Sequence, residues 1–239
     1  VTDISVLNEG VVKAGFDKDG EELYTINREG DFFAIKSYNT SSKAVVEEHQ
    51  LPFPPESLRD IVQLGDLLIF HIGERNLCIY SLANNELLQR QITLGGFIQI
   101  KAARILKHSN HLVVPFINFR TEPRLQGQLA YIDIKTGEIS GLSATFNESF
   151  VSRSEVISSM TIDQEREMIY VSTSTPNNAV HRRNPGKGNV YAFNPKNGSV
   201  KITDLANKHQ LNYLRFEPRN KFFIASDEDR STFASWLDS

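Results

Sequence analysis

Short apolar runs recur along the whole chain, and each is bounded by residues that favour turns. Five runs rich in β-branched and aromatic residues occupy 22–26, 67–72, 111–117, 168–174 and 222–226. Gly, Asp, Asn or Pro stands just before each of them, as at the start of a β-strand. Almost no segment has a helical period, and residues 55–64 are the one place where a short helix is possible.

A second marker follows each of these runs. The anchor residues are each followed by polar residues, in most cases by a turn that contains Gly or Asn, which tolerate a positive φ. These anchors are Phe33, Ile79, Tyr131, Tyr191 and Phe233, separated by 46, 52, 60 and 42 residues. The pattern therefore predicts four strands in each unit. A turn joins the first strand to the second, a loop joins the second to the third, and a turn joins the third to the fourth.

Five units of this size, each with four strands, predict an all-β protein with the β-propeller fold. We place the blades at approximately 9–52, 58–94, 97–146, 154–206 and 209–239 plus 1–8, in a single domain that spans 1–239. A β-sandwich also has many short strands, but it gives no reason for two aligned markers to recur. A fragment of a six- to eight-bladed ring is the alternative to five blades.

The two ends of the chain favour closure of the five-bladed ring. The last unit stops after its third strand, and a spare β-like run at 2–7 precedes the first unit. If that run supplies the missing strand, the ring closes without an exposed edge. Pro115 does not fit an inner strand, because proline lacks the N–H that the ladder needs, so we expect a bulge there.

The strand pairs around these turns resemble known propeller repeats. "LAYIDIKTGEI" and "VYAFNPKNGSV" are similar to repeats of the quinoprotein-like and YVTN-type propellers, and "FDKDGEELYTINREGDFFAI" resembles a blade of those or of the gluconolactonase-like group. The tryptophan that usually follows the turn in quinone-binding repeats is absent after Gly137 and Gly198. This departure argues against quinone binding.

Composition limits the function classes. The 239 residues carry 29 acidic and 26 basic side chains, a net charge of −3, so attraction of the whole surface to nucleic acid is not expected. Cys78 is the one cysteine, which excludes a disulfide framework within the chain. No apolar run is long enough to span a membrane as a helix. The chain opens without Met, which we interpret as processing, and the compartment stays open.

Candidate metal ligands are few. Glu9, Asp60, Glu155 and Asn212 come from four predicted blades, near the mouth of the predicted channel. Converging oxygen ligands suit a hard cation such as calcium. In the gluconolactonase-like group, which "NEGVV" resembles through Glu9, such a metal implies hydrolysis of a lactone or ester. The other interpretation is ordinary polar residues at strand starts, and we expect neither a bound cofactor nor a catalytic residue.

The predicted ligand-binding residues lie in two long loops and the connection between their blades. The segments 118–128 and 174–189 join the second and third strands of adjacent units, so they should rise side by side from one face. The basic residues they bring together are Arg120, Arg124, Arg153, Arg182, Arg183 and Lys187. Arginine suits carboxylate and phosphate groups, although a solvated fringe is an equal alternative.

These patterns favour a non-enzymatic binding or scaffold module that recognises a protein, an acidic peptide or an anionic glycan on its loop face. The alternative is a metal-dependent hydrolase of the lactonase or esterase kind, acting at the channel mouth. A carbohydrate-binding propeller would need exposed aromatic platforms, for which Phe150, Tyr213 and Trp236 are the candidates.

Overall fold

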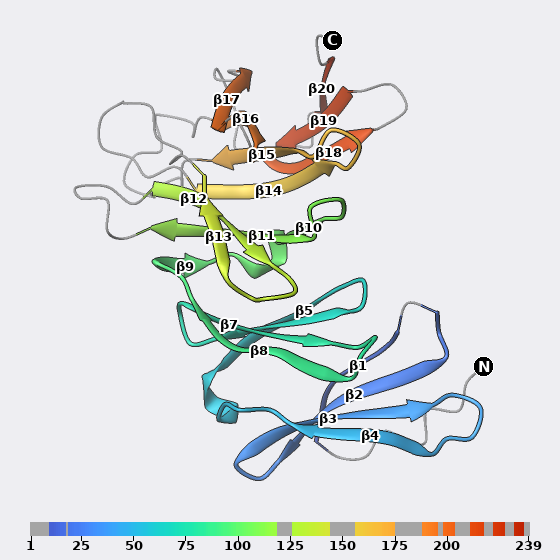
Figure 1. Ribbon diagram of the computed structural model, residues 1–239. Helices are drawn as coiled ribbons and strands as arrows, with labels where there is room; N and C mark the ends of the chain where they lie inside the picture. The colour runs from blue at the N-terminus through green and yellow to red at the C-terminus, as the bar shows by residue number, and fades with distance from the viewer. Residues whose placement is uncertain are drawn as a thin grey trace. The chain divides into compact units, whose positions relative to one another are not determined.

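A computed structural model describes most of the chain (Figure 1). The described residues are 10–17, 19–118, 126–143, 156–174, 188–195, 198–203, 211–217, 222–227 and 232–236. Among them the regular structure consists of β-strands and two three-residue 3-10 turns, and every strand pair is antiparallel. The predicted all-β class, built from antiparallel sheets of about four strands, is confirmed.

The chain forms two compact units, residues 1–93 and residues 94–239, here called unit 1 and unit 2. Unit 1 contains two four-stranded sheets whose strands follow one another in chain order. Sheet 1 comprises β1 (Val11–Phe16), β2 (Glu22–Glu29), β3 (Phe32–Asn39) and β4 (Val45–Gln50). Sheet 2 comprises β5 (Leu58–Leu64), β6 (Leu67–Ile72), β7 (Asn76–Ser81) and β8 (Glu86–Thr93).

Unit 2 contains three further sheets. Sheet 3 comprises β9 (Gly96–Ile98), β10 (Arg104–Leu106), β11 (His111–Asn118), β12 (Gln126–Asp133) and β13 (Ile139–Leu142). Sheet 4 comprises β14 (Val156–Asp163), β15 (Met168–Ser174), β16 (Gly188–Asn194) and β17 (Gly198–Thr203). Sheet 5 has three described strands, β18 (Leu211–Glu217), β19 (Phe222–Asp227) and β20 (Thr232–Trp236).

The two sequence markers fall on consecutive strands of each sheet. The five apolar runs form the second strands, β2, β6, β11, β15 and β19, and the five anchors lie on the third strands, β3, β7, β12, β16 and β20. Each anchor opposes a residue of the preceding strand, for example Ile79 with Ile69 and Tyr191 with Val171. Of these central strands, β6 and β7 are buried at all but one position each, because an apolar run at the middle of a sheet is covered on both faces.

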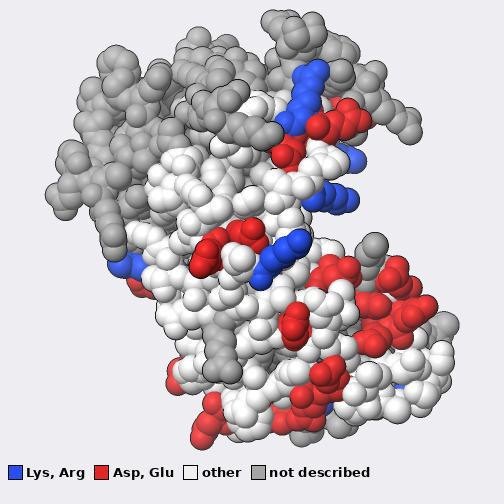
Figure 2. All heavy atoms as spheres, in the orientation of Figure 1, with Lys and Arg blue, Asp and Glu red and all other residues white. Residues whose placement is uncertain are grey.

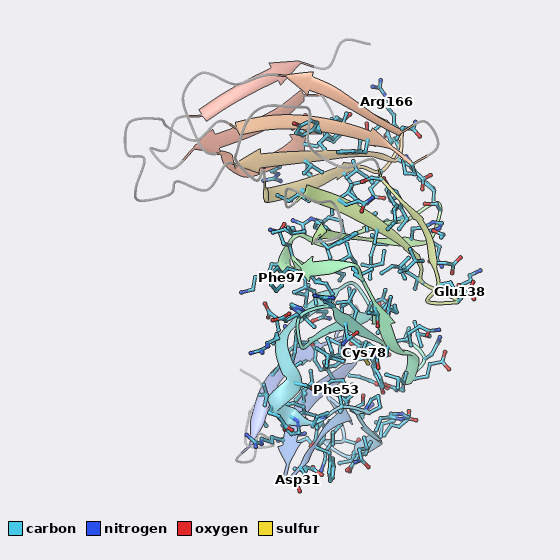
Figure 3. All side chains as sticks on the ribbon, turned by 90° about the vertical axis from the view of Figure 1, so that its left-hand side faces the viewer. Asp31, Phe53, Cys78, Phe97, Glu138 and Arg166 are labelled. Atoms are coloured by element: carbon cyan, nitrogen blue, oxygen red, sulfur yellow. The ribbon has the colours of Figure 1, made fainter. Side chains whose placement is uncertain are left out.

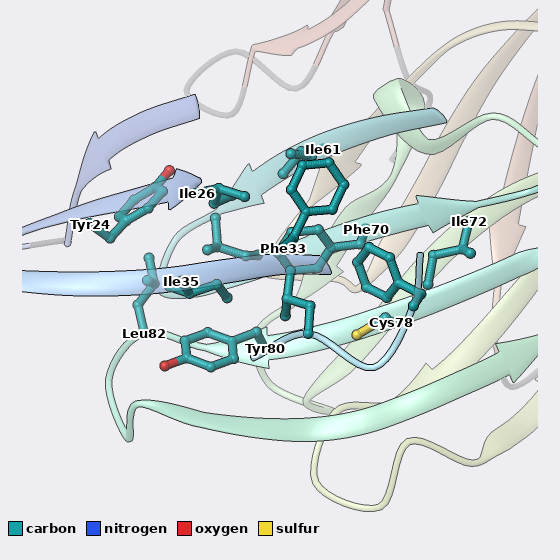
Figure 4. Close-up of a cluster of buried hydrophobic side chains, with 13 residues drawn as sticks. Tyr24, Ile26, Phe33, Ile35, Ile61, Phe70, Ile72, Cys78, Tyr80 and Leu82 are labelled. Atoms are coloured by element: carbon teal, nitrogen blue, oxygen red, sulfur yellow. The ribbon is translucent and has the colours of Figure 1, made fainter. Parts of the chain in front are cut away.

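The core of unit 1 lies between its two sheets (Figure 4). Tyr24, Ile26, Phe33 and Ile35 of sheet 1 pack against residues such as Phe70 of sheet 2. Figure 3 shows Phe53 and Cys78 among the strands of this unit. A separate core cluster in unit 2 includes Val113, Leu129 and Tyr131 of sheet 3 and Ile157, Val171 and Phe193 of sheet 4.

The short helix that the sequence allows over 55–64 does not form. Pro55–Ser57 form a single 3-10 turn, η1, and the chain then enters strand β5 at Leu58. Pairing with β6 explains the difference: Ile61 opposes Phe70 and Leu64 opposes Leu67, so the apolar residues are used at strand spacing. Tertiary pairing overrides a short apolar pattern that fits both periods.

Pro115 lies in β11, the second strand of sheet 3, and the first strand is interrupted opposite it. β9 and β10 pair with the two ends of β11, and a 3-10 turn, η2 (Ile100–Ala102), separates them. The Pro115 carbonyl accepts a hydrogen bond from the Gln99 N–H at 2.9 Å, so the proline nitrogen also faces this interruption. The missing N–H therefore falls where no regular ladder passes.

Candidate functional site

The first strand of every sheet is irregular near its beginning. In β1, β5, β14 and β18 a register shift leaves one residue without an opposite partner: Val12, Arg59, Ser158 and Asn212. In sheet 3 the interruption between β9 and β10 stands in the same place. Bulges occur often beside binding sites, because the extra residue points its side chain in a new direction. This recurring feature identifies the start of the first strands as the region to examine.

A pocket of about 390 Å³ lies at two of these bulges, within unit 1. It is lined by Val12, Lys13, Phe33, Pro55, Leu58, Arg59, Asp60 and Ile61. The bulge residues of the two first strands of unit 1, Val12 and Arg59, are therefore part of its lining. Its volume lies within the range of small-molecule sites, which starts at about 300 Å³. We call it the bulge pocket.

Three charged side chains line the bulge pocket. Lys13 is half-buried and its Nζ donates to the Ile61 carbonyl at 2.7 Å, which ties β1 to β5. Arg59 is exposed, so its guanidinium is in contact with solvent. The Asp60 carboxylate accepts from the Ile61 N–H at 2.9 Å. Two cations against one carboxylate leave the pocket wall locally positive.

This positive wall stands in an acidic part of the chain. Residues 1–93 carry 15 acidic and 8 basic side chains. Figure 2 shows the resulting group of acidic side chains over unit 1. The field of this unit therefore disfavours anions in general, and attraction at the bulge pocket depends on Lys13 and Arg59 at short range.

The rest of the pocket lining is largely apolar. Phe33 is buried, and its ring lies 6.3 Å from that of Phe53, which in turn lies 5.6 Å from Phe70. Pro55 is the first residue of η1 and is also buried. These buried side chains provide the apolar part of the pocket lining.

Two side-chain hydrogen bonds join sheet 1 to sheet 2 beside the pocket, and we call them the Tyr24–Gln63 latch. The Tyr24 hydroxyl donates to Gln63 Oε1 at 2.8 Å, and Gln63 Nε2 donates to the Phe16 carbonyl at 2.9 Å. Burial raises the pKa of Tyr24 to about 12, so the hydroxyl keeps its proton and stays a donor at neutral pH. This Tyr24–Gln63 latch connects sheet 1 to sheet 2 beside Lys13.

The structure describes only some of the residues that the sequence analysis singled out. Asp60 lies on the wall of the bulge pocket. Asn212 is the bulge residue of β18, although only its backbone is described. Glu9 and Glu155 lie outside the described residues, as do the six predicted ligand-binding residues Arg120, Arg124, Arg153, Arg182, Arg183 and Lys187. Of the proposed aromatic platforms, Tyr213 and Trp236 lie in β18 and β20, and Phe150 lies outside the described residues.

The two segments that carry most of those basic residues lie between described strands. Asn118 ends β11 and Gln126 begins β12, while Ser174 ends β15 and Gly188 begins β16. The loops are therefore somewhat shorter than the segments 118–128 and 174–189. The residues between these strands lie outside the part of the chain that the structure describes.

Metal ligands do not gather among the described residues. In that part of the chain no group of three or more His, Cys, Asp and Glu side chains could hold a metal ion. The four-residue metal hypothesis has only Asp60 with a described side chain, so it remains a prediction.

Sequence reasoning did not identify Lys13 and Arg59, which supply the cations of the pocket. The available signal was a charged residue at the start of a predicted first strand, next to Asp60 in the case of Arg59.

In the described residues no helix is long and apolar enough to cross a membrane. No protein-family model matches the chain, and comparison with curated proteins finds no significant relative.

Proposed function

We propose that the chain is a non-catalytic β-propeller that binds a ligand at the bulge pocket. The single observation that carries this proposal is a pocket at the first strands of two consecutive sheets, whose lining combines two cations with apolar side chains. Pockets with few polar groups and a largely apolar lining are typical of ligand sites.

Contacts between first strands support the propeller. In unit 1, β1 and β5 are joined by the Lys13–Ile61 and Gln63–Phe16 hydrogen bonds. In unit 2, β14 contacts β10 on one side and β18 on the other. Propeller blades meet in this way at their innermost strands, around a central channel. The bulge pocket would then open toward that channel.

The composition of the pocket supports binding over catalysis. The eight lining residues that the structure describes include no Ser, Thr, Cys or His, the side chains that most often act as nucleophile or general base. Asp60 and Lys13 are the acid–base candidates among them, and the Asp60 carboxylate already accepts a backbone hydrogen bond. Lys13 is likewise engaged by a backbone carbonyl. This chemistry suits recognition of an anionic group.

The second part of the proposal concerns a macromolecular partner. The six basic residues of the two long loops and their connection form a cationic group in the sequence of a chain that is slightly acidic overall. An acidic peptide or an anionic glycan would complement them. This loop face is proposed from the sequence, independently of the bulge pocket.

A metal-dependent hydrolase is the second candidate. Two observations favour it: Asp60 lines the pocket, and Asn212 occupies the bulge of β18 that corresponds to Arg59 in β5. With Glu9 and Glu155 these residues would supply oxygen ligands from four sheets.

Two measurements separate these functions. Metal content of the purified protein, together with hydrolysis of 4-nitrophenyl acetate and a simple lactone, tests the hydrolase. Amide chemical shifts recorded with a set of small acids, amines and alcohols test binding at the pocket. We expect shifts at residues 12–13 and 58–61 without turnover. A stoichiometric divalent ion and turnover that are both lost in Asp60→Asn would overturn the proposal.

A further inference from the structure

We infer that the ligand of the bulge pocket is a monocarboxylate with an apolar tail. Its carboxylate would lie between Lys13 and Arg59, and its tail against Phe33, Pro55 and Leu58. The inference rests on the proposed function, since it names the chemical class that the same pocket takes.

Lys13 and Arg59 can donate further hydrogen bonds to a ligand. Lys13 has three N–H donors, and the bond to the Ile61 carbonyl uses one of them. Arg59 contributes up to five donors on a planar fork that matches a carboxylate. Arg59 is also the bulge residue of β5, so its side chain leaves the regular alternation of the strand at the pocket. A carboxylate can therefore bond to both cations without breaking the Lys13–Ile61 contact.

Charge selects a single negative charge. Among the described lining residues, two cations and the Asp60 carboxylate give a net charge of +1. The surrounding residues 1–93, with 15 acidic and 8 basic side chains, repel a second negative charge. A phosphate dianion would bring two negative charges to a lining with a net charge of +1, so the pocket favours the monoanion.

The apolar wall requires a tail. The Phe33 ring packs on Phe53, which packs on Phe70, and the side chains of Pro55 and Leu58 complete a surface that cannot hydrogen-bond. Val12, at the bulge of β1, is 51% exposed and is part of the pocket lining. A tail of aryl or alkyl groups would cover Val12 and remove apolar surface from water. Acetate has no such tail and should bind weakly.

The test compares probes that share one tail. 4-Phenylbutyrate, 4-phenylbutanol and 4-phenylbutylamine are titrated into the full chain, with acetate and inorganic phosphate as further probes, and binding is followed by amide chemical shifts. We expect 4-phenylbutyrate to bind at least about fivefold more tightly than the alcohol, as one partly exposed ion pair allows. Arg59→Gln should reduce that advantage about fivefold. Arg28→Gln removes an exposed arginine of β2 outside the pocket and serves as the matched control.

The outcomes separate this inference from the proposed function. Equal binding of the acid and the alcohol at residues 12–13 and 58–61, or stronger binding of phosphate, overturns the carboxylate and leaves a pocket that binds ligands. If no probe shifts these residues, both ideas are wrong. A peptide ending in Phe, as free acid and as amide, identifies the source of the carboxylate. Discrimination between the two forms indicates a protein C-terminus, and binding of 4-phenylbutyrate alone indicates a small acid.

Discussion

Gly15 lies directly under the ring of Tyr24, and replacing it should loosen the Tyr24–Gln63 latch. A Cβ at position 15 would stand 2.5 Å from the Tyr24 hydroxyl oxygen, 2.8 Å from Cζ and 2.9 Å from Cε1. Real side chains almost never approach so closely, so the ring or strand β1 must move. Tyr24 is 1% exposed within the unit 1 core, which leaves the ring little room to turn. Gly15→Ala should therefore break its hydrogen bond to Gln63.

The expected cost follows from two terms. Forcing an extra methyl group into a packed core costs about 1–3 kcal/mol. Losing the Tyr24–Gln63 hydrogen bond, which measures 2.8 Å, adds about 0.5–1.5 kcal/mol. Gly15→Ala should thus lower the free energy of unfolding of unit 1 by roughly 2–4 kcal/mol. Gly141→Ala is the matched control, because its Cβ would lie 3.7 Å from the Tyr131 ring, an ordinary contact.

Urea denaturation of the two alanine variants and of Tyr24→Phe completes the test. Tyr24→Phe alone should cost about 1 kcal/mol, since it removes the hydroxyl and keeps the ring. The combination with Gly15→Ala should cost less than the sum, because one hydrogen bond cannot be lost twice. The reasoning fails if Gly15→Ala is as mild as Gly141→Ala, or if the two unit 1 changes add fully.

Three further predictions concern single groups. Burial raises the pKa of Cys78 to about 12, so alkylation by iodoacetamide at pH 8 should be at least about 100-fold slower in the native protein than in urea, and equal rates would contradict this. The backbone N–H groups of Thr136 and, to a smaller extent, Lys135 lower the pKa of Asp133 in the folded protein. The ionised carboxylate therefore stabilises the fold at pH values above the pKa of Asp133 in the unfolded chain. That stabilisation disappears as the pH falls through the folded pKa, so Asp133→Asn should flatten the melting temperature profile between about pH 2 and 5. Arg182→Ala with Arg183→Ala should weaken binding of polyglutamate and its salt dependence, and unchanged affinity would exclude the loop face.

The central strands could be predicted because both of their faces are covered. β6 and β7 read as continuous apolar runs, and the turns on either side of them contain Gly or Asn at positive φ, as at Gly65 and Asn85. Such runs carry strand identity without any knowledge of the neighbours. Antiparallel sheets in chain order then follow from the short connections between consecutive strands.

The candidate site could not be predicted in the same way, because it depends on irregularities. A β-bulge adds one residue to one strand, and nothing in the alternation of β1 or β5 marks Val12 or Arg59 as that residue. The contact between Lys13 and the Ile61 carbonyl joins residues 48 positions apart and involves a backbone acceptor with no sequence signal. Asp60 was identified only because acidic residues are natural candidates for metal ligands.

Closure of the ring is the remaining prediction. Sheet 5 has three described strands where sheets 1, 2 and 4 have four, and in the described part of the chain β20 pairs only with β19. Residues 2–7 are the segment with strand character that could pair with β20 and complete the sheet. Removal of residues 1–8 should then leave the amides of β20 that do not bond to β19 exposed, with at least about tenfold faster hydrogen exchange. The amides of β6 serve as the internal reference, since that strand is paired on both sides within sheet 2. If β20 exchanges at the same rate with and without residues 1–8, the N-terminal strand does not close the ring, and the fragment of a larger ring becomes the better account.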